Sequence, residues 1–177
     1  MTRRGSGSMA DVRALGPLGM VTLRTDLAAA AGALRDGLGL DVPERLRIAG
    51  DTRRGAAWMA PDELLLFVAP GEGGAVAADL GRRLGEVPHL CADVSDLRVG
   101  FAVEGEGWRE VLAKLSPADL HPDAFGSRAF RRTRLGQVAA AIWPEGDGAH
   151  VLVFRSFGDY TLRLLRQSAF DGAVGFF

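Results

Sequence analysis

Five consecutive apolar residues in the first half of the chain constrain the fold most strongly. They are residues 64–68, LLLFV. Successive side chains of a strand point to opposite faces of its sheet, so an uninterrupted apolar run is typical of a strand covered on both faces. We therefore predict that 64–68 is a central strand. A similar run at 151–154, VLVF, predicts a second central strand in the other half of the chain.

The elements around these two strands occur in the same order in both halves. The first half predicts strands at 20–24, 46–49, 56–59, 63–69 and 90–94, with helices at 27–37 and 75–84. The second half predicts strands at 98–104, 134–143 and 150–154, with helices at 108–115 and from 157 or 159 to about 169. Asp26 is expected to cap the first helix, and Gly37 and Gly39 to end it. Helices that alternate with strands in this way exclude a helical bundle and a β-sandwich.

This repeated order predicts an α+β fold in which two tandem β-α-β-β-α(-β) units pack as one body. The half-units are expected at about 20–96 and 97–171, within a single domain that covers 20–177. Residues 1–19 are interpreted as a disordered tail. Its first eight residues, MTRRGSGS, lack the apolar segment of a signal peptide.

Charge and cysteine content restrict the partners and the compartment. The formal net charge of −1 predicts neither nucleic acid nor an anionic membrane as a partner. No apolar run approaches the ~20 residues of a membrane helix. The single cysteine, Cys91, excludes an intramolecular disulfide and fits a reducing compartment, so a cytoplasmic location is expected. Its place in a strand-like run favours an inert, packed thiol.

Few residues have the spacing of a catalytic or ligand-binding motif. The glycine-rich loop at 70–74 lacks the Gly-Lys-Ser/Thr ending of a phosphate-binding loop. The three histidines lie far apart, and only His121 has acids nearby, Asp119 and Asp123. That group leaves a weak metal or general-base site open beside the simpler interpretation of a solvated turn. We assign no catalytic, cofactor-binding or metal-binding residue.

Arginines crowd one stretch, SRAFRRTR, at residues 127–134. With Arg155, this basic strip of Arg128, Arg131, Arg132 and Arg134 suits a folate polyglutamate tail, a flavin phosphate or an acidic partner surface. A solvated edge strand that is kept soluble by charge is the alternative. We predict that Arg128, Arg131, Arg132 and Arg155 contact a larger protein partner, with the apolar rim near Trp58 as the other candidate interface.

A set of motifs in a fixed order resembles the sarcosine oxidase gamma-subunit family. Residues 58–66, WMAPDELLL, are similar to the family signature Trp-Leu-Gly-Pro-Asp-Glu-Trp-Leu-Leu. The family's order continues with the segments 93–96, 112–114, 119–120, 133–135 and 155–157, together with Pro122 and Phe125. The resemblance runs from about residue 20 to 165.

The resemblance implies a fold like the folate-binding domain of aminomethyltransferases. Those enzymes carry a functional aspartate on the strand that here reads QVAAAI at 137–142, where no acid occurs. The Asn of their Asn-Asp-Leu loop corresponds to Ala118. The resemblance further implies a non-catalytic structural subunit of a heterotetrameric sarcosine oxidase. In this family, FAD, FMN, NAD and tetrahydrofolate are expected on the larger subunits, with no cofactor on this chain.

Two other functions stay open from the sequence. One is a stand-alone folate-binding or aminomethyltransferase-like module. The other is an adaptor for a different flavoprotein amine oxidase. The reaction implied by the resemblance to the sarcosine oxidase gamma-subunit family is oxidative demethylation of sarcosine to glycine, hydrogen peroxide and methylene-tetrahydrofolate.

Overall fold

The computed structural model describes residues 8–170, 172 and 174–176, and these divide into two compact units. The first unit consists of residues 16–98 together with 128–130. The second unit consists of the described residues up to 15, residues 99–127 and the described residues from 131 onward. Each unit has its own five-stranded sheet. Within the described residues, no helix combines the length and the hydropathy that crossing a membrane requires.

The sheet of the first unit has the strand order β3-β4-β5-β2-β6. In chain order the elements of this unit are β2 (Gly19–Thr25), α1 (Leu27–Leu38), β3 (Ile48–Gly50), β4 (Gly55–Ala60), β5 (Glu63–Val68), α2 (Gly73–Leu84) and β6 (His89–Asp93). β5 lies in the middle of the sheet, and all five residues of its apolar run are buried. The first predicted central strand is therefore confirmed.

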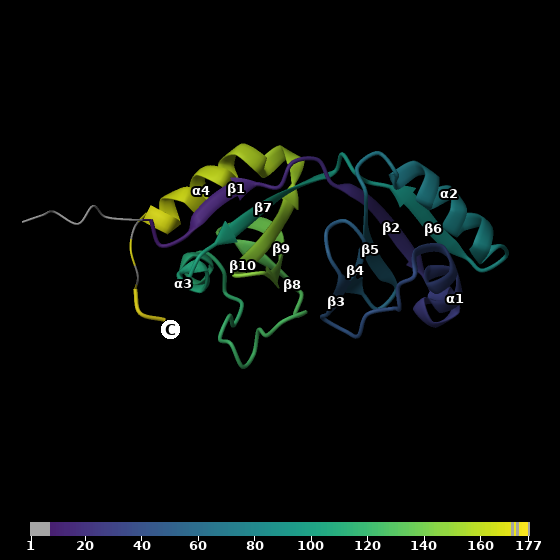
Figure 1. The fold of residues 1–177 in the computed structure, drawn as a ribbon, viewed down its shortest axis with the longest axis horizontal. Coiled ribbons are helices and arrows are strands. Elements are labelled where there is room, and N and C mark those ends of the chain that lie inside the picture. Colours follow the sequence, from purple (N-terminus) through teal and green to yellow (C-terminus); the bar gives the residue numbers. More distant parts are fainter. Residues whose placement is uncertain (1–7, 171, 173, 177) are drawn as a thin grey trace, which may run out of the picture. The chain divides into compact units, whose positions relative to one another are not determined.

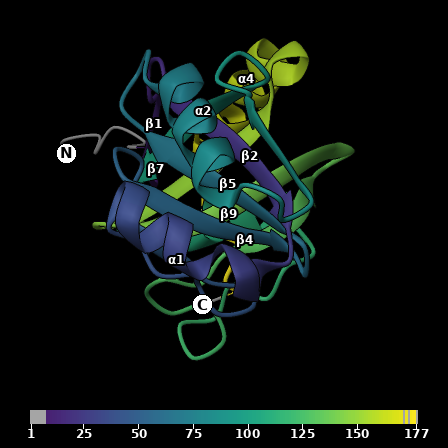
Figure 2. The same cartoon turned by 90° about the vertical axis from the view of Figure 1, so that its right-hand side faces the viewer.

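Helices α1 and α2 lie side by side over one face of this sheet (Figure 2). Their buried apolar side chains recur at intervals of three and four residues, which places them on one face of each helix. These side chains are Leu27, Ala30, Leu34 and Leu38 of α1 and Ala77, Leu80 and Leu84 of α2. The Asp26 side chain accepts a hydrogen bond from Ala28 N–H, and Gly39 ends α1 in the left-handed conformation at φ 65°. The predicted cap at Asp26 and stop at Gly39 are confirmed, whereas Gly37, which was also expected to end the helix, lies within α1.

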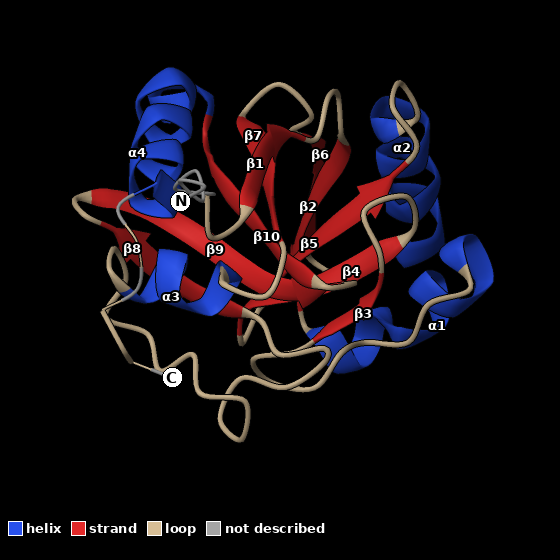
Figure 3. Cartoon of the chain, turned by 60° about the vertical axis from the view of Figure 1, so that its left-hand side comes forward, coloured by secondary structure: helices blue, strands red, loops and turns tan. Residues whose placement is uncertain are grey.

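The sheet of the second unit has the strand order β1-β7-β10-β9-β8. In chain order the elements are β1 (Asp11–Ala14), β7 (Arg98–Glu104), α3 (Trp108–Ala113), β8 (Arg131–Leu135), β9 (Val138–Glu145), β10 (Gly148–Phe154), the 3₁₀ helix η1 (Arg155–Phe157) and α4 (Gly158–Phe170). β10 is the middle strand, and residues 151–153 are buried, which confirms the second predicted central strand except at Phe154, which is exposed. Helix α4 packs along β1 (Figure 1), and Figure 3 distinguishes the helices of both units from their strands.

The amino-terminal segment is a correction to the sequence prediction. A disordered tail was expected over residues 1–19, but Asp11–Ala14 form β1, which runs antiparallel to β7 with Val12 opposite Val103. Only Val12 of the four β1 residues is buried. The four residues, DVRA, contain one large apolar side chain, which is too short a pattern to indicate a strand from the local sequence. Residues 1–7 of the expected tail lie outside the described residues.

The predicted strand at 134–143 is a second correction. The chain instead turns at Gly136 and Gln137, and Leu135 lies opposite Val138 in the hairpin of β8 and β9. Gly136 has φ 58°, a conformation that glycine adopts without the steric cost of a Cβ atom. The two units also divide near residue 98, close to the expected boundary at 96–97. However, β1 belongs to the second unit and residues 128–130 belong to the first, although chain order alone suggests the opposite.

Candidate functional site

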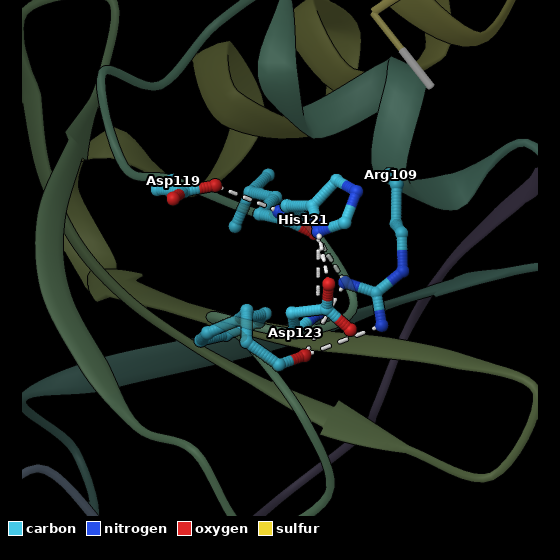
Figure 4. Close-up of polar contacts among 6 residues, drawn as sticks. Arg109, Asp119, His121 and Asp123 are labelled. Atoms are coloured by element: carbon cyan, nitrogen blue, oxygen red, sulfur yellow. Dashed lines mark hydrogen bonds and ion pairs between the residues drawn. The ribbon is translucent and has the colours of Figure 1, made fainter.

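The loop that follows α3 is tied to that helix by Arg109. The guanidinium of Arg109 donates hydrogen bonds to the carbonyl oxygen of Leu120 and, at 3.2 and 3.3 Å, to that of Phe125. Its Cζ also lies 4.2 Å from the centroid of the Trp108 ring. Figure 4 shows Arg109 extending from α3 toward the loop. Burial lowers the pKa of Arg109 from its ordinary value, but an arginine remains charged. Arg109 therefore holds the loop at two points.

The polar residues of this loop bind its own backbone. Asp119 Oδ1 accepts a hydrogen bond from His121 N–H at 2.9 Å, and His121 Nδ1 accepts one from Asp123 N–H at 3.3 Å. His121 Nδ1 and Asp123 Oδ2 lie 3.5 Å apart, and both side chains are largely exposed. Within the described ranges, no group of three or more His, Cys, Asp or Glu side chains has a geometry that could hold a metal ion. The polar groups of this loop thus form a hydrogen-bonded turn.

The basic strip is divided between the two units. Arg128 belongs to the first unit, where its carbonyl oxygen accepts a hydrogen bond from Ile48 N–H at 3.0 Å. Arg131 begins β8 in the second unit, donates to the carbonyl oxygen of Ala124 at 3.1 Å and lies 5.6 Å from the centroid of the Phe125 ring. Arg131 therefore stabilises the same loop as Arg109. This contact could not be recognised from the sequence, because the path of the loop is what brings Ala124 and Phe125 next to Arg131.

Strand register separates the remaining members of the basic strip. Arg132 is exposed on β8 opposite Ala141, while Arg155 is exposed and follows the last residue of β10. Val153 of β10 lies opposite Ala140, and Arg134 lies opposite Ala139. The end of β10 is therefore nearer to Arg134 than to Arg132. The sequence prediction that Arg155 lies beside Arg131 and Arg132 does not follow from this register.

Trp58 lies on β4 in the first unit and is half-buried. It packs against the core cluster beneath α1 and α2, and its backbone N–H donates to the carbonyl oxygen of Arg47 at 3.0 Å. Part of its ring remains accessible, as an interface residue requires. The segment 137–142, where aminomethyltransferases carry a functional aspartate, spans the end of a turn and the start of β9. Gln137 occupies the β8–β9 turn, and β9 has no acid before Glu145.

A buried carboxylate on α3 holds the chain that follows α4, which sequence reasoning missed. Glu110 is 7% exposed, and its two carboxylate oxygens accept hydrogen bonds from Val174 N–H at 3.2 Å and Phe176 N–H at 2.5 Å. Lys114 Nζ donates to the carbonyl oxygens of Ser168 and Gly172 at 2.5 and 2.6 Å. By helical spacing Glu110 falls outside the apolar face of α3 that Trp108, Val111 and Leu112 form. It is nevertheless buried, because residues 174 and 176 return to this side of the helix.

The comparison with protein families matches most of the described chain. Residues 24–171 match the model of the "Sarcosine oxidase, gamma subunit family". The sarcosine oxidase subunit gamma of Corynebacterium sp. strain P-1 is 34% identical over 136 residues, which cover 75% of this chain and 66% of that protein. The subunit gamma of Corynebacterium sp. strain U-96 is 36% identical over 143 residues, which cover 80% of this chain and 67% of that protein. The matched stretch thus spans about two thirds of the length of these relatives.

Solved structures show the same relationship. A chain of the heterotetrameric sarcosine oxidase from Corynebacterium sp. U-96, in complex with pyrrole 2-carboxylate, superposes with a TM-score of 0.82 and 29% identity. The match covers 94% of this chain and 88% of that chain. The glycine cleavage system aminomethyltransferase T from Bartonella henselae superposes with a TM-score of 0.67 and 16% identity, over 94% of this chain and 50% of that chain. At this identity the second match establishes the fold alone, and it confirms the expected likeness to aminomethyltransferases.

Proposed function

Because the chain belongs to the sarcosine oxidase gamma subunit family, we propose that it is a structural subunit of a heterotetrameric sarcosine oxidase. Its similarity to a chain of such a heterotetramer, over 94% of its length, is the observation that carries the proposal. In this proposal the chain supports assembly, and the larger subunits carry FAD, FMN, NAD and tetrahydrofolate.

The internal hydrogen bonds of the second unit support a structural role. Arg109 is engaged by two backbone carbonyl groups, and the Glu110 carboxylate by two backbone N–H groups. A general acid, base or anion-binding residue has to present its polar atoms to a substrate. These side chains present theirs to the protein backbone. They fix a surface in place, which is what a subunit that positions a partner requires.

The reaction of the proposed complex divides into two balanced steps. Sarcosine gives two electrons and two protons, by way of flavin, to dioxygen, which is reduced to hydrogen peroxide. The oxidised methyl carbon is then joined to tetrahydrofolate as methylene-tetrahydrofolate, and glycine is released. Neither step uses a residue of this chain in our proposal.

The basic strip and Trp58 enter the proposal as contacts to a larger subunit. Arginine is favoured at protein interfaces because its planar guanidinium bonds carboxylates and is weakly hydrated. Arg131 also holds the loop after α3, so Arg128, Arg132 and Arg155 are the better residues for a test of the strip alone.

Co-expression with the larger subunits tests this function. The complex is purified through a tag on this chain, and the eluate is assayed for flavin absorbance and for sarcosine-dependent peroxide formation. We expect a yellow complex that consumes sarcosine, and no turnover by the chain purified alone. Turnover by the isolated chain, or tight binding of tetrahydrofolate to it in a calorimetric titration, would support the alternative of a stand-alone folate-binding or aminomethyltransferase-like module. A colourless eluate without partners would contradict the proposal.

A further inference from the structure

Three exposed aromatic side chains form a ridge where β10 leads into α4. Phe154, Phe157 and Tyr160 are 39%, 45% and 53% exposed. Residues three apart lie above one another in a 3₁₀ helix, and they share a face of an α-helix. The passage from η1 into α4 therefore aligns Phe157 with Tyr160, and Arg163 continues the row one further turn along α4, while Phe154 precedes η1 as the last residue of β10.

The turn between β8 and β9 extends this surface. A Cβ atom added to Gly136 would lie 3.9 Å from the Tyr160 hydroxyl oxygen, so this turn lies beside the ridge. Arg134 lies opposite Ala139, and the register of β9 with β10 brings Phe154 into the same row. Two strand spacings put Arg134 about 10 Å from Phe154, on the same face of the sheet. Aromatic and arginine side chains thus share one surface, which we call the aromatic–arginine ridge: Arg134, Phe154, Arg155, Phe157, Tyr160 and Arg163.

The composition of this ridge is that of a protein-binding surface. Aromatic residues and arginine are enriched at interfaces and supply most of the residues with large binding contributions. Scattered single apolar side chains are normal on a protein surface, whereas three in seven residues at a regular spacing form a patch. The stretch from 154 to 163 contains two arginines and one acid, Asp159. With Arg134, the local charge is positive on a chain whose formal net charge is −1.

We propose that the aromatic–arginine ridge binds a protein surface in which carboxylates surround an apolar pocket. The rings of Phe157 and Tyr160 enter the pocket, and Arg134, Arg155 and Arg163 face the carboxylates. This inference rests on the proposed function, since the larger subunits of the complex are the partner. It identifies a docking surface that differs from the basic strip in its aromatic centre and shares Arg134 and Arg155 with it.

Two double variants and one matched control test the ridge. Phe157→Ala with Tyr160→Ala removes the rings, and Arg134→Ser with Arg155→Ser removes charge. Phe170→Ala is the control, because Phe170 is 62% exposed at the other end of the same helix. All side chains concerned are exposed, and circular dichroism checks that each variant folds. The affinity of each variant for the larger subunits is measured by biolayer interferometry at low and high salt.

We expect the double aromatic variant to bind about tenfold or more weakly, as loss of central interface aromatics does. The double arginine variant is expected to associate more slowly and with a smaller dependence on salt. The control is expected to bind like the original chain. Unchanged binding by the aromatic variant would overturn the ridge but leave the proposed function intact, whereas no binding by the original chain would overturn both.

The same variants also test whether the aromatic–arginine ridge binds a nucleic acid. A fluorescently labelled single-stranded oligonucleotide is titrated with the original chain, and its anisotropy is measured. We expect no binding, because three arginines beside a net negative chain supply few phosphate contacts. Binding that is lost in the double arginine variant would overturn the assignment to a protein partner.

Discussion

The carboxylate of Asp93 lies directly against the Cα of Gly73, at the first turn of α2. A Cβ atom at Gly73 would come within 2.5 Å of both Cγ and Oδ1 of Asp93. Asp93 Oδ1 accepts hydrogen bonds from Ser95 Oγ at 2.5 Å and Ser95 N–H at 2.9 Å. Hydrogen bonds from the Ser95 hydroxyl, the Ser95 backbone N–H and the Gly74 backbone N–H hold the pKa of Asp93 below its ordinary value. A strand end is thereby joined to a helix start, where a negative charge is favourable.

Replacement of Gly73 by Ala is expected to lower the stability of the first unit. The added methyl group would displace the Asp93 carboxylate from its donors, at a cost of roughly 1–3 kcal/mol in the free energy of unfolding. Gly74→Ala is the matched control, because its Cβ atom would lie 3.8 Å from Asp93 Oδ2 and alanine favours helix. Urea unfolding followed by circular dichroism measures both. A Gly73→Ala midpoint equal to that of Gly74→Ala would show that the contact is not important.

His150 is expected to make the stability of the second unit depend on pH. Burial, and after it the nearby positive charge of Arg13, lower the pKa of His150 to about 4, and the charge of Glu104 partly opposes this shift. In the unfolded chain its pKa is about 6.5, so the neutral form favours folding. The contribution is complete above about pH 6.5 and is lost as the pH falls toward 4, for a total of about 3 kcal/mol.

Stability curves at several pH values between 7 and 4 measure this effect. His150→Phe, which keeps a ring against Trp143, should flatten the curve in this range. His121→Gln, at an exposed position, should leave its slope unchanged. An unchanged slope in the His150 variant would assign the pH dependence to other groups.

Arg109 is expected to determine the order of the loop after α3. Arg109→Lys keeps the charge but cannot bond the carbonyl groups of Leu120 and Phe125 together while stacking on Trp108. We expect a loss of about 1–2 kcal/mol and faster hydrogen exchange at residues 118–127. Arg132→Lys, on the exposed side of β8, is the control and should leave exchange in this loop as it is. Equal protection of the loop in both variants would argue against the role of Arg109.

Cys91 is expected to react slowly with thiol reagents in the folded protein. Burial raises the pKa of its thiol to about 11, so at pH 8 about one molecule in a thousand carries the reactive thiolate. Because the chain has one cysteine, the absorbance of released nitrothiobenzoate reports on this site alone. The rate should rise by a large factor in guanidinium chloride. Rapid labelling without denaturant would indicate that the strand β6 opens frequently.

The basic strip is expected to affect the rate of assembly. Arg128→Asn with Arg132→Ser removes two charges, retains Arg131 on its loop, and keeps a residue that tolerates the left-handed conformation of Arg128 at φ 65°. We expect slower association with the larger subunits and a weaker dependence on salt, with little change in folding stability. Arg45→Ser, at an exposed position of the first unit, is the charge control. If the double variant assembles at the original rate at every salt concentration, the strip does not contact the partner.

Local sequence pattern predicted the central elements and missed contacts between distant segments. The apolar run of β5, the Asp26 cap of α1 and the glycine that ends α1 could be recognised from the sequence, because each signal lies within a few residues. β1 has a single buried side chain, and its partner strand lies far along the chain. Glu110 has the helical spacing of a solvent-facing residue of α3, and no nearby residue indicates that Val174 and Phe176 return to it. The division of the basic strip likewise depends on strand register and on the placing of residues 128–130.

The position of β1 has a consequence for the order in which the protein folds during synthesis. Residues 16–98, which form nearly all of the first unit, leave the ribosome before the second unit can form. β1 is made before these residues, yet Val12 pairs with Val103 of β7, so β1 has to wait for a strand that is made later. In a nascent chain that ends near residue 98, β1 still lacks its partner strand. A ribosome pause at that point would prolong the interval in which a chaperone, or another nascent chain, can bind this segment.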